Sequence, residues 1–518
     1  MRRPYDAPPR DTESNPSPHR GPRYMKSSTP AIHVFRSPRL PLLLFSWLCS
    51  LFLLVAPTRA QPGGLDAGPA PPGAEQPAAP QTSDNLGEVS TMPSIADALP
   101  NPDPGGVRAA LGRRGITYDL TYIGETLGNA SGGTRRGVIY QGLLDAQIDV
   151  DLERLVGLPG LRVHADIFQA HGRGLSRCCL GDNYLIASGI ETRPGLRLYE
   201  LWIEQELWDG RVAVRAGRLG VDTEFFISQY ATLFVNGTFS WPALAAVNLP
   251  ANGAARLIAA PGVRLMLAPT EGLTASAALF AADEAETGDA AERGDGRGTG
   301  SGRGTAPLVV AEVAYAYNQG RGAAGLPGVI KLGGYHHFGR FDDLRFDAEG
   351  EALADPDGSG IARRLRGNSG AYAVLDQLVW RKPGTRDQGL GLFVRVAGSP
   401  SASGVIDLYA DGGVTYKGLF AGRVNDTLGL GVAYARFSRA ARGADRDAIR
   451  FDPEARFVRS SEAVVELSYQ AEIVPGFTVQ PSVQYIVRPG GGVENPRDPG
   501  RRAIKDAAVF GLRATVHY

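Results

Sequence analysis

The sequence predicts an all-β protein, a 16-stranded antiparallel transmembrane β-barrel with short periplasmic turns and long external loops. Apolar and polar residues alternate with period two, in segments of about ten residues, from Ile116 to the C-terminus. Beyond Ala60, no apolar run reaches the ~20 residues that a membrane-spanning helix needs. The segments are joined by short and long connections in turn, as in a barrel that crosses a membrane.

The first 60 residues are expected to be a leader and signal peptide. The apolar segment Leu40–Val55 follows an arginine-rich stretch and precedes the small-residue sequence Pro57–Ala60, after which we expect cleavage. A retained membrane anchor is the alternative. It is disfavoured because about 16 apolar residues fall short of the ~20 that span a bilayer.

Residues 61–115 are expected to form a Pro/Ala/Gly-rich periplasmic linker. From Gln61 to about Ser83 the chain has almost no large apolar residue, so it cannot offset the entropy of ordering itself. A short helical turn is expected near Val107–Arg114. It would lead into the barrel, to which we assign residues 116–518.

The alternation of the strands is clear near the C-terminus. From Ala463 to Ile473 the odd positions are apolar and the even positions are polar, except at Val464. One face of such a strand meets lipid and the other meets water. The sixteen strands are expected to begin near Ile116, Gly142, Leu161, Leu198, Arg211, Pro261, Leu273, Val309, Val329, Ala371, Leu390, Val405, Thr427, Glu462, Phe477 and Lys505.

The expected connections differ between the two sides of the membrane. Short turns such as Asp209–Gly210 and Pro475–Gly476 contrast with long loops such as 220–260 and 338–370. The last strand ends in the aromatic Tyr518, an ending that suits the bacterial barrel-assembly machinery. A soluble β-sandwich is disfavoured because sandwiches usually close with about seven to nine strands.

The Asp209–Gly210 turn predicts the register of one hairpin. These residues favour a two-residue turn with positive φ at both positions, which places Glu204 directly opposite Arg215. We expect the pair to face the lumen. An Arg on the lipid side costs roughly 2–4 kcal/mol at the midplane, whereas an opposed ion pair on a wet strand face gains at most about 1 kcal/mol.

Charges of both signs recur at the positions expected to face water. Such charges would support a hydrated pore and supply polar partners for sugar hydroxyls without selecting strongly for ions. Taken one at a time, many of them could equally be solvated strand faces. The charged candidates for the pore lining are Glu204, Arg215, Arg264, Arg395 and Asp407.

The loop from Gly220 to Ala260 is unusually aromatic for an external connection. It carries six Phe, Tyr and Trp residues amid few charges, and so apolar a loop should not lie open in water. It could fold inward and narrow the pore, offering Phe225, Tyr230 and Trp241 to sugar rings, or pack against a neighbouring subunit. Of these, we predict the inward fold.

The sequence predicts no catalytic residue, no metal site and no cofactor. Residues 355–360 resemble the start of a calcium loop, but Arg366 replaces the bidentate Glu at its twelfth position. His336 and His337 are adjacent and point to opposite faces of a strand. Cys178 and Cys179 are not expected to bond, since sequence neighbours rarely do. A net charge of +0 gives no sign of nucleic-acid binding.

Short motifs occur between about Gly115 and Tyr518. They include Gly174–Ser176, Gly181–Asn183, Arg197–Trp202, Arg215–Arg218, Asn248–Pro250, Ala260–Arg264, Gly367–Asn368, Ala373–Gln377, Tyr416–Leu419, Gln484–Ile486 and Pro489–Gly492. With these motifs the chain resembles the OprB-type carbohydrate-selective porins. The resemblance implies a sixteen-stranded outer-membrane barrel that passes glucose and related sugars by facilitated diffusion, without a cofactor. The chain departs from the family pattern at Cys178–Cys179 and in a Gly/Arg-rich insertion near Gly294, both in expected external loops.

Two further interpretations remain open at this point. One is a general diffusion porin with little solute selectivity, and the other is a barrel with an enzymatic or adhesive function. The expected location is the cell outer membrane. The expected partners are mono- or small oligosaccharides, outer-membrane lipid, the barrel-assembly machinery and a possible homotrimer.

Overall fold

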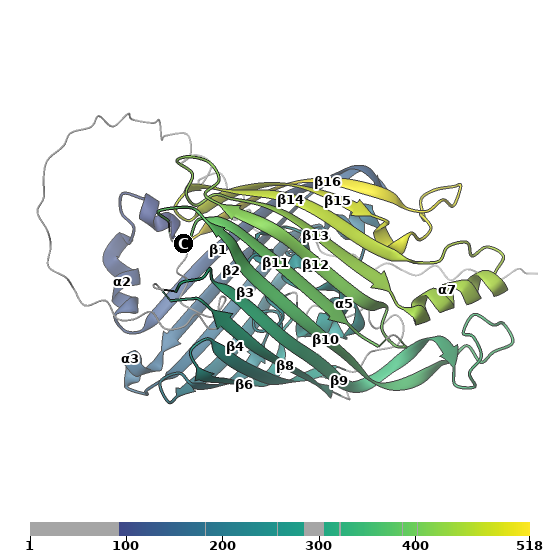
Figure 1. Cartoon of the computed structure of the whole chain (residues 1–518), viewed down its shortest axis with the longest axis horizontal. Coiled ribbons are helices and arrows are strands. Elements are labelled where there is room, and N and C mark those ends of the chain that lie inside the picture. Colours follow the sequence, from purple (N-terminus) through teal and green to yellow (C-terminus); the bar gives the residue numbers. More distant parts are fainter. Residues whose placement is uncertain are drawn as a thin grey trace, which may run out of the picture. The chain divides into compact units, whose positions relative to one another are not determined.

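The computed structural model describes residues 93–518 apart from 182, 256, 284–304, 321–322, 386 and 401 (Figure 1). The expected leader, signal peptide and Pro/Ala/Gly-rich part of the linker therefore lie outside the described residues. In the described part, α2 (Val107–Gly112) lies where a short helical turn was expected. No described helix is long and apolar enough to cross a membrane.

Sixteen strands form one closed barrel in which each strand pairs with its sequence neighbours and β1 pairs with β16 (Figure 1). The fold class predicted from the sequence is confirmed. The strands are β1 (Ile116–Gly133), β2 (Gly137–Asp151), β3 (Leu161–Gly172), β4 (Gly195–Leu207), β5 (Val212–Leu219), β6 (Ala260–Thr270), β7 (Leu273–Asp283), β8 (Thr305–Tyr317), β9 (Gly328–Asp347), β10 (Ala362–Arg381), β11 (Gly389–Gly398), β12 (Ile406–Lys417), β13 (Thr427–Phe437), β14 (Ser461–Val474), β15 (Phe477–Val487) and β16 (Lys505–His517).

Each strand begins close to its predicted start, except β10. This strand begins at Ala362 rather than near Ala371 because β9 and β10 keep pairing beyond the other strands, as far as Asp347 and Ala362. Figure 1 shows this pair as a twisted ribbon that reaches toward α7 (Arg439–Phe451), a helix in the connection from β13 to β14. The longest strand pair therefore extends past the rim of the barrel.

The alternation of burial along the strands gives each side chain its face. Large apolar residues such as Leu332, Leu430 and Leu467 are 61 %, 46 % and 47 % exposed, and they belong on the outer surface. Their neighbours along the strand point into the barrel and are largely buried. The outer surface is thus the apolar belt that a membrane barrel presents to lipid.

The hairpin between β4 and β5 has the predicted register. Glu204 pairs directly with Arg215, and Asp209 and Gly210 both have positive φ, at 55° and 77°. Trp208 also has positive φ, so the turn opens one residue earlier than a two-residue turn. Glu204 and Arg215 are 3 % and 5 % exposed, while Ile203, the residue before Glu204, is 44 % exposed. The ion pair therefore faces the interior.

The two chain ends of the barrel meet at the periplasmic side. The backbones of Leu120 and Tyr518 bond to each other in both directions, at 2.9 and 2.8 Å. The guanidinium of Arg108, in α2, lies over the rings of Tyr118 and Tyr518 and 3.7 Å from Asp119. The short helix thus packs over the seam at which β1 and β16 close the barrel.

The remaining short elements lie in the connections. The 3₁₀ segments η1 (Ile95–Ala98) and η2 (Pro104–Gly106) precede α2, and α3 (Leu152–Val156) joins β2 to β3. The connection from β3 to β4 contains η3 (Ser176–Leu180). The connection from β5 to β6 contains η4 (Ala231–Leu233), α4 (Gly237–Ser240), α5 (Ala243–Asn248) and α6 (Ala251–Ala254), and η5 (Pro489–Gly491) follows β15.

A charged side chain placed on the outward face of a strand should destabilise the barrel in lipid. Leu332→Arg should lower the free energy of unfolding in lipid by roughly 2–4 kcal/mol, because Leu332 faces outward in the body of β9. Urea titration in phospholipid vesicles measures this change, with Leu332→Met as the matched control. A variant with arginine that unfolds like the methionine control would show that this face does not contact lipid.

Candidate functional site

The connection from β5 to β6, residues 220–259, is called here the inner loop. Its aromatic side chains are almost completely buried, with Phe225, Phe226, Phe234 and Phe239 at most 1 % exposed and Trp241 3 % exposed. They belong to one apolar cluster that also contains inward-facing residues of many strands. The inner loop therefore fills part of the barrel interior, as the sequence predicted, and does not stand out in solvent.

Carboxylates on three distant strands bind backbone amides of the inner loop. Glu312 on β8 accepts from the amide of Phe226 at 2.9 Å. Asp376 on β10 accepts from the hydroxyl of Ser228 at 2.5 Å and from the next amide at 3.0 Å. Glu466 on β14 accepts from the amides of Val235 and its neighbour at 2.7 and 2.8 Å. These bonds attach the loop to opposite parts of the wall.

Arg395 on β11 holds the middle of the loop. Its guanidinium pairs with Asp411 on β12 at 2.5 Å and donates to the backbone carbonyls of Phe226 at 3.2 Å and Phe239 at 2.8 Å. The side chain is 0 % exposed. Arg395 was predicted to line the pore. The structure instead brings it together with the loop backbone as an anchor.

The start of the inner loop joins a buried network of four charges. Arg215 pairs with Glu204 and Glu224, both at 2.8 Å, and Arg264 pairs with the same carboxylates at 3.2 and 2.5 Å. The guanidinium carbon of Arg215 also lies 3.7 Å from the ring centre of Trp202. Two arginines and two glutamates balance in charge, which makes their burial tolerable. Glu224 is the member that the sequence analysis missed.

Glycines on the inner wall give the aromatic residues room. A Cβ added to Gly431 on β13 would meet ring atoms of Phe234 and Phe239 at 2.9 and 3.0 Å. A Cβ at Gly391 on β11 would run into the ring of Tyr230. Glycine is needed at these positions because the loop packs directly on the strand backbone.

Tyr230 differs from the other aromatic residues because it is only half-buried. Burial raises the pKa of Tyr230 to about 12, so its phenol stays protonated at neutral pH and can both donate and accept hydrogen bonds. Of the aromatic candidates, Phe225 and Trp241 are packed inside the loop, whereas Tyr230 keeps an accessible edge.

A second loop, residues 173–194 between β3 and β4, also reaches the interior. Glu462 on β14 accepts from the amides of Tyr184 and Leu185 at 3.1 and 2.8 Å, and Ser188 donates to Glu125 on β1 at 2.6 Å. The structure joins Cys178 and Cys179 in this loop by a disulfide, contrary to the expectation from their adjacency. The backbone carbonyl of Cys179 accepts from the amides of residues 134 and 135, so this pair packs against the β1–β2 hairpin.

Asp407 departs from the predicted parity. The register of β12 and β13 shifts between Ile406 and Leu408, and Asp407 sits at this irregularity. Its carboxylate accepts from Arg436 at 2.7 Å, and Arg436 is level with Leu408. The Asp407 carboxylate therefore pairs across this irregularity with Arg436 and has no hydrogen bond to a described residue of the inner loop, because a bulge re-aims the side chain at which it occurs.

The inner wall of β1 to β3 carries a different set of polar residues. Asp119, Asp145 and Asp149 face inward on β1 and β2, and His164 and Asp166 face inward opposite them on β3. The carboxylate of Asp149 accepts from the imidazole of His164 at 2.8 Å, and Gln147 donates to Asp145 at 3.0 Å. Among the described residues, the partners of this set lie on neighbouring strands or near the chain ends.

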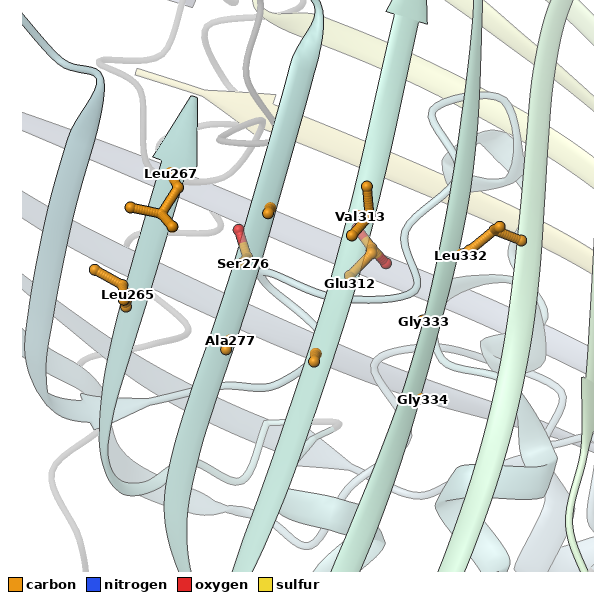
Figure 2. A pocket seen from close by; sticks show the side chains of 11 residues that line it. Leu265, Leu267, Ser276, Ala277, Glu312, Val313, Leu332, Gly333 and Gly334 are labelled. Atoms are coloured by element: carbon orange, nitrogen blue, oxygen red, sulfur yellow. The ribbon is translucent and has the colours of Figure 1, made fainter. Parts of the chain in front are cut away.

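An apolar hollow of about 490 Å³ lies on the outer surface of the barrel, over β6 to β9 (Figure 2). Leu265, Leu267, Val313 and Leu332 from β6, β8 and β9 surround it, with Gly333 and Gly334 at its floor. These leucines and valine are outward-facing and exposed. The hollow therefore belongs to the lipid-facing surface and not to the lumen. Within the described residues, no three His, Cys, Asp or Glu side chains are arranged to hold a metal ion.

A closed sixteen-stranded barrel narrowed by inward-folded loops defines a class of protein, the diffusion channels of the outer membrane. The family model described as carbohydrate-selective porin, OprB family, matches residues 135–518, and the chain belongs to this family. The resemblance recognised in the sequence is confirmed. The protein is therefore an outer-membrane porin for carbohydrates.

Two known proteins illustrate the relationship. Porin B of Pseudomonas aeruginosa is 28 % identical over 431 residues, which cover 79 % of this chain and 90 % of that protein. The high-pH structure of Pseudomonas putida OprB superposes with a TM-score of 0.70 at 24 % identity, covering 80 % of this chain and 97 % of that one. The second comparison supports the fold alone.

Removal of Glu224 should destabilise the protein strongly. Glu224→Ala leaves Arg215 and Arg264 buried with Glu204 as their remaining shared carboxylate, so the free energy of unfolding should fall by roughly 3–5 kcal/mol. Urea unfolding in detergent micelles measures the loss. Glu153→Ala, at an exposed position in α3, is the control. If both variants unfold alike, the four-charge network does not hold the loop.

Proposed function

We propose that sugars cross the barrel between the inner wall of β1 to β3 and the accessible edge of Tyr230, which packs on β11 at the far side of the ring of strands. One observation carries this proposal. Inward polar residues from β4 to β15 are used to anchor the inner loop, including Glu200, Arg264, Glu312, Asp376, Arg395, Glu466 and Gln480. Within the described residues, no hydrogen bond joins Asp119, Asp145, Asp149 or Asp166 to the inner loop.

The chemistry of this wall suits a neutral polyhydroxyl solute. Carboxylate oxygens accept hydrogen bonds from sugar hydroxyls, and the Gln147 amide can both donate and accept. Each bond to the wall replaces a bond to water, so its net contribution is only about 0.5–1.5 kcal/mol. A solute held by a few such bonds is bound weakly enough to leave, and diffusion needs no energy input. Glucose-sized sugars are the expected substrates.

The outer surface supports the predicted contact with outer-membrane lipid, since its exposed residues form an apolar belt. The amphipathic last strand, with Phe510 and Leu512 outward and Tyr518 at its end, supports recognition by the barrel-assembly machinery. The homotrimer stays a prediction.

Sugar selectivity should appear as a rate difference between solutes of equal size. In liposome swelling, we expect glucose to enter faster than an amino acid of similar size, and a disaccharide to enter more slowly than glucose. Asp145→Ala combined with Asp149→Ala should lower the glucose rate several-fold because hydroxyl partners are lost. Asp387→Ala, in an exposed turn outside the lumen, is the matched control. Rates that follow solute size alone would favour a general diffusion porin.

Tyr230 should affect sugars more than ions. Tyr230→Ala removes a half-buried ring and its hydroxyl from the loop edge, so glucose permeation should change more than single-channel potassium conductance. Tyr230→Phe keeps the ring that packs on Gly391 and separates the role of the hydroxyl from that of packing. An equal change in sugar flux and ion conductance would mean that Tyr230 only sets the pore width.

A further inference from the structure

Two arginines face each other on the ribbon formed by β9 and β10. Arg340 and Arg366 are directly opposed in the register, and both are exposed. In the described part of the chain neither has an ion pair or a side-chain hydrogen bond. Like charges directly opposite each other on a strand pair are destabilising. A bound anion would relieve this repulsion.

The two arginines lie on the outward face of the barrel. Along β9, His337 and Phe341 are 0 % and 5 % exposed and point inward, while Phe338 is 56 % exposed. Arg340 alternates with His337 and Phe341, so it shares the outward face with Phe338. Arg366 pairs with Arg340 and therefore points the same way.

Their height along the strand places them just above the lipid. A tilted strand crosses the apolar layer in about 9–11 residues, which from Gly328 ends near Phe338. An exposed aromatic at this point suits the girdle that marks the edge of the apolar layer. Arg340 is the next outward residue along β9. The guanidinium groups thus lie at the level of the lipid headgroups.

Among the residues that the structure describes, the surroundings leave the positive charge uncompensated. The nearest outward carboxylate on β9 is that of Asp342, and it is already paired with Arg364 at 2.5 Å. On the membrane side, His336 bonds to Ser369 at 2.6 Å and stacks edge-on with Phe338. A ligand at Arg340 and Arg366 must therefore bring its own negative charge.

The hollow of Figure 2 continues this surface below the arginines. Gly334, at its floor, and Leu332, at its side, lie on the same strand as Arg340. Six residues of strand separate Gly334 from Arg340, roughly 20 Å at the usual rise per residue. This is comparable to the length of a fatty acyl chain. The outward surface of β9 is thus apolar at the hollow, where an acyl chain would lie, and cationic at Arg340, where a headgroup would lie, with His336 and Phe338 between them.

We propose that Arg340 and Arg366 bind the phosphate group of a phosphorylated lipid in the outer leaflet, with an acyl chain of that lipid in the hollow of β6 to β9. Guanidinium groups bind phosphate by paired, charge-assisted hydrogen bonds, and the two opposed forks fit opposite edges of one phosphate. Bound phosphate neutralises the cross-strand repulsion.

Native mass spectrometry of the full barrel tests this site. The detergent-solubilised protein is incubated with an equal mixture of bisphosphorylated lipid A and its dephosphorylated analogue. We expect the wild type to retain the phosphorylated lipid in roughly thirtyfold preference, since each of the two arginines contributes about 1 kcal/mol, or about fivefold, toward an anionic lipid near a membrane surface. Arg340→Ala combined with Arg366→Ala should lose this preference.

The control removes the same charge elsewhere. Arg446→Ala combined with Arg497→Ala takes two exposed external arginines away from the lipid-facing surface and should keep the preference. Heat-modifiable mobility on gels verifies that each barrel is folded. If the alanine pair does not fold, Arg340→Lys combined with Arg366→Lys should still show a reduced preference, because lysine lacks the bidentate fork.

Three results would overturn the proposal. They are equal retention of the two lipids by the wild type, an equal loss of preference in the control, and displacement of bound lipid by inorganic phosphate alone. The last result would identify a site for free anions and not for a lipid. Leu332→Trp, which fills the hollow, should weaken lipid retention without changing phosphate preference; unchanged retention removes the hollow from the site.

Discussion

The structure depends on one constraint, that polar backbone groups placed inside a membrane barrel must find partners there. The inner loop has little regular secondary structure, so many of its amides and carbonyls cannot bond within the loop. Glu312, Asp376 and Glu466 accept from its amides, and Arg395 donates to its carbonyls. The charges on the wall are thus matched to the polarity of the loop backbone. Without them, the loop could not lie in the lumen.

This constraint also divides the lumen. Where wall charges bind the loop, they are desolvated and paired, so they are not available to a solute. On β1 to β3 the inward polar residues are also largely buried, but they interact mainly with one another and not with the inner loop. A sugar requires such a surface, because hydroxyls exchange hydrogen bonds with water and with the wall at little net cost. The same residue types therefore have two roles. They anchor the inner loop where they contact it, and they are proposed to bind sugar where they do not.

Much of the fold could be predicted from the sequence because strand periodicity and turn chemistry are local. The alternation from Ala463 to Ile473 assigns faces, and Asp209–Gly210 sets the register that brings Glu204 opposite Arg215. Inward folding of the aromatic loop could also be predicted, because six aromatic residues are costly to expose. These inferences need only neighbouring residues.

The rest of the site depends on contacts between distant parts of the chain. Arg395 looks like a pore residue from its parity, yet its partners include carbonyls of the inner loop more than a hundred residues earlier. Phe225 and Trp241 are recognisable as interior residues, but only the packed loop shows that they lie inside the apolar cluster and not against a solute. Asp407 follows a register irregularity that alternation cannot anticipate. Glu224 stands in a loop, where no periodicity marks it.

Parity and height along a strand together decide what an arginine does in a barrel. Arg264 faces inward in a membrane-spanning strand, so it must be paired, and it is held by Glu204 and Glu224. Arg340 faces outward, which would be costly in the apolar layer. It lies two residues beyond Phe338 on β9, and therefore outside that layer. At that height the lipid penalty has vanished, and an unpaired guanidinium next to an apolar belt meets the charged part of the lipid. The long β9–β10 ribbon thus extends beyond the apolar layer and places two arginines at the level of the lipid headgroups.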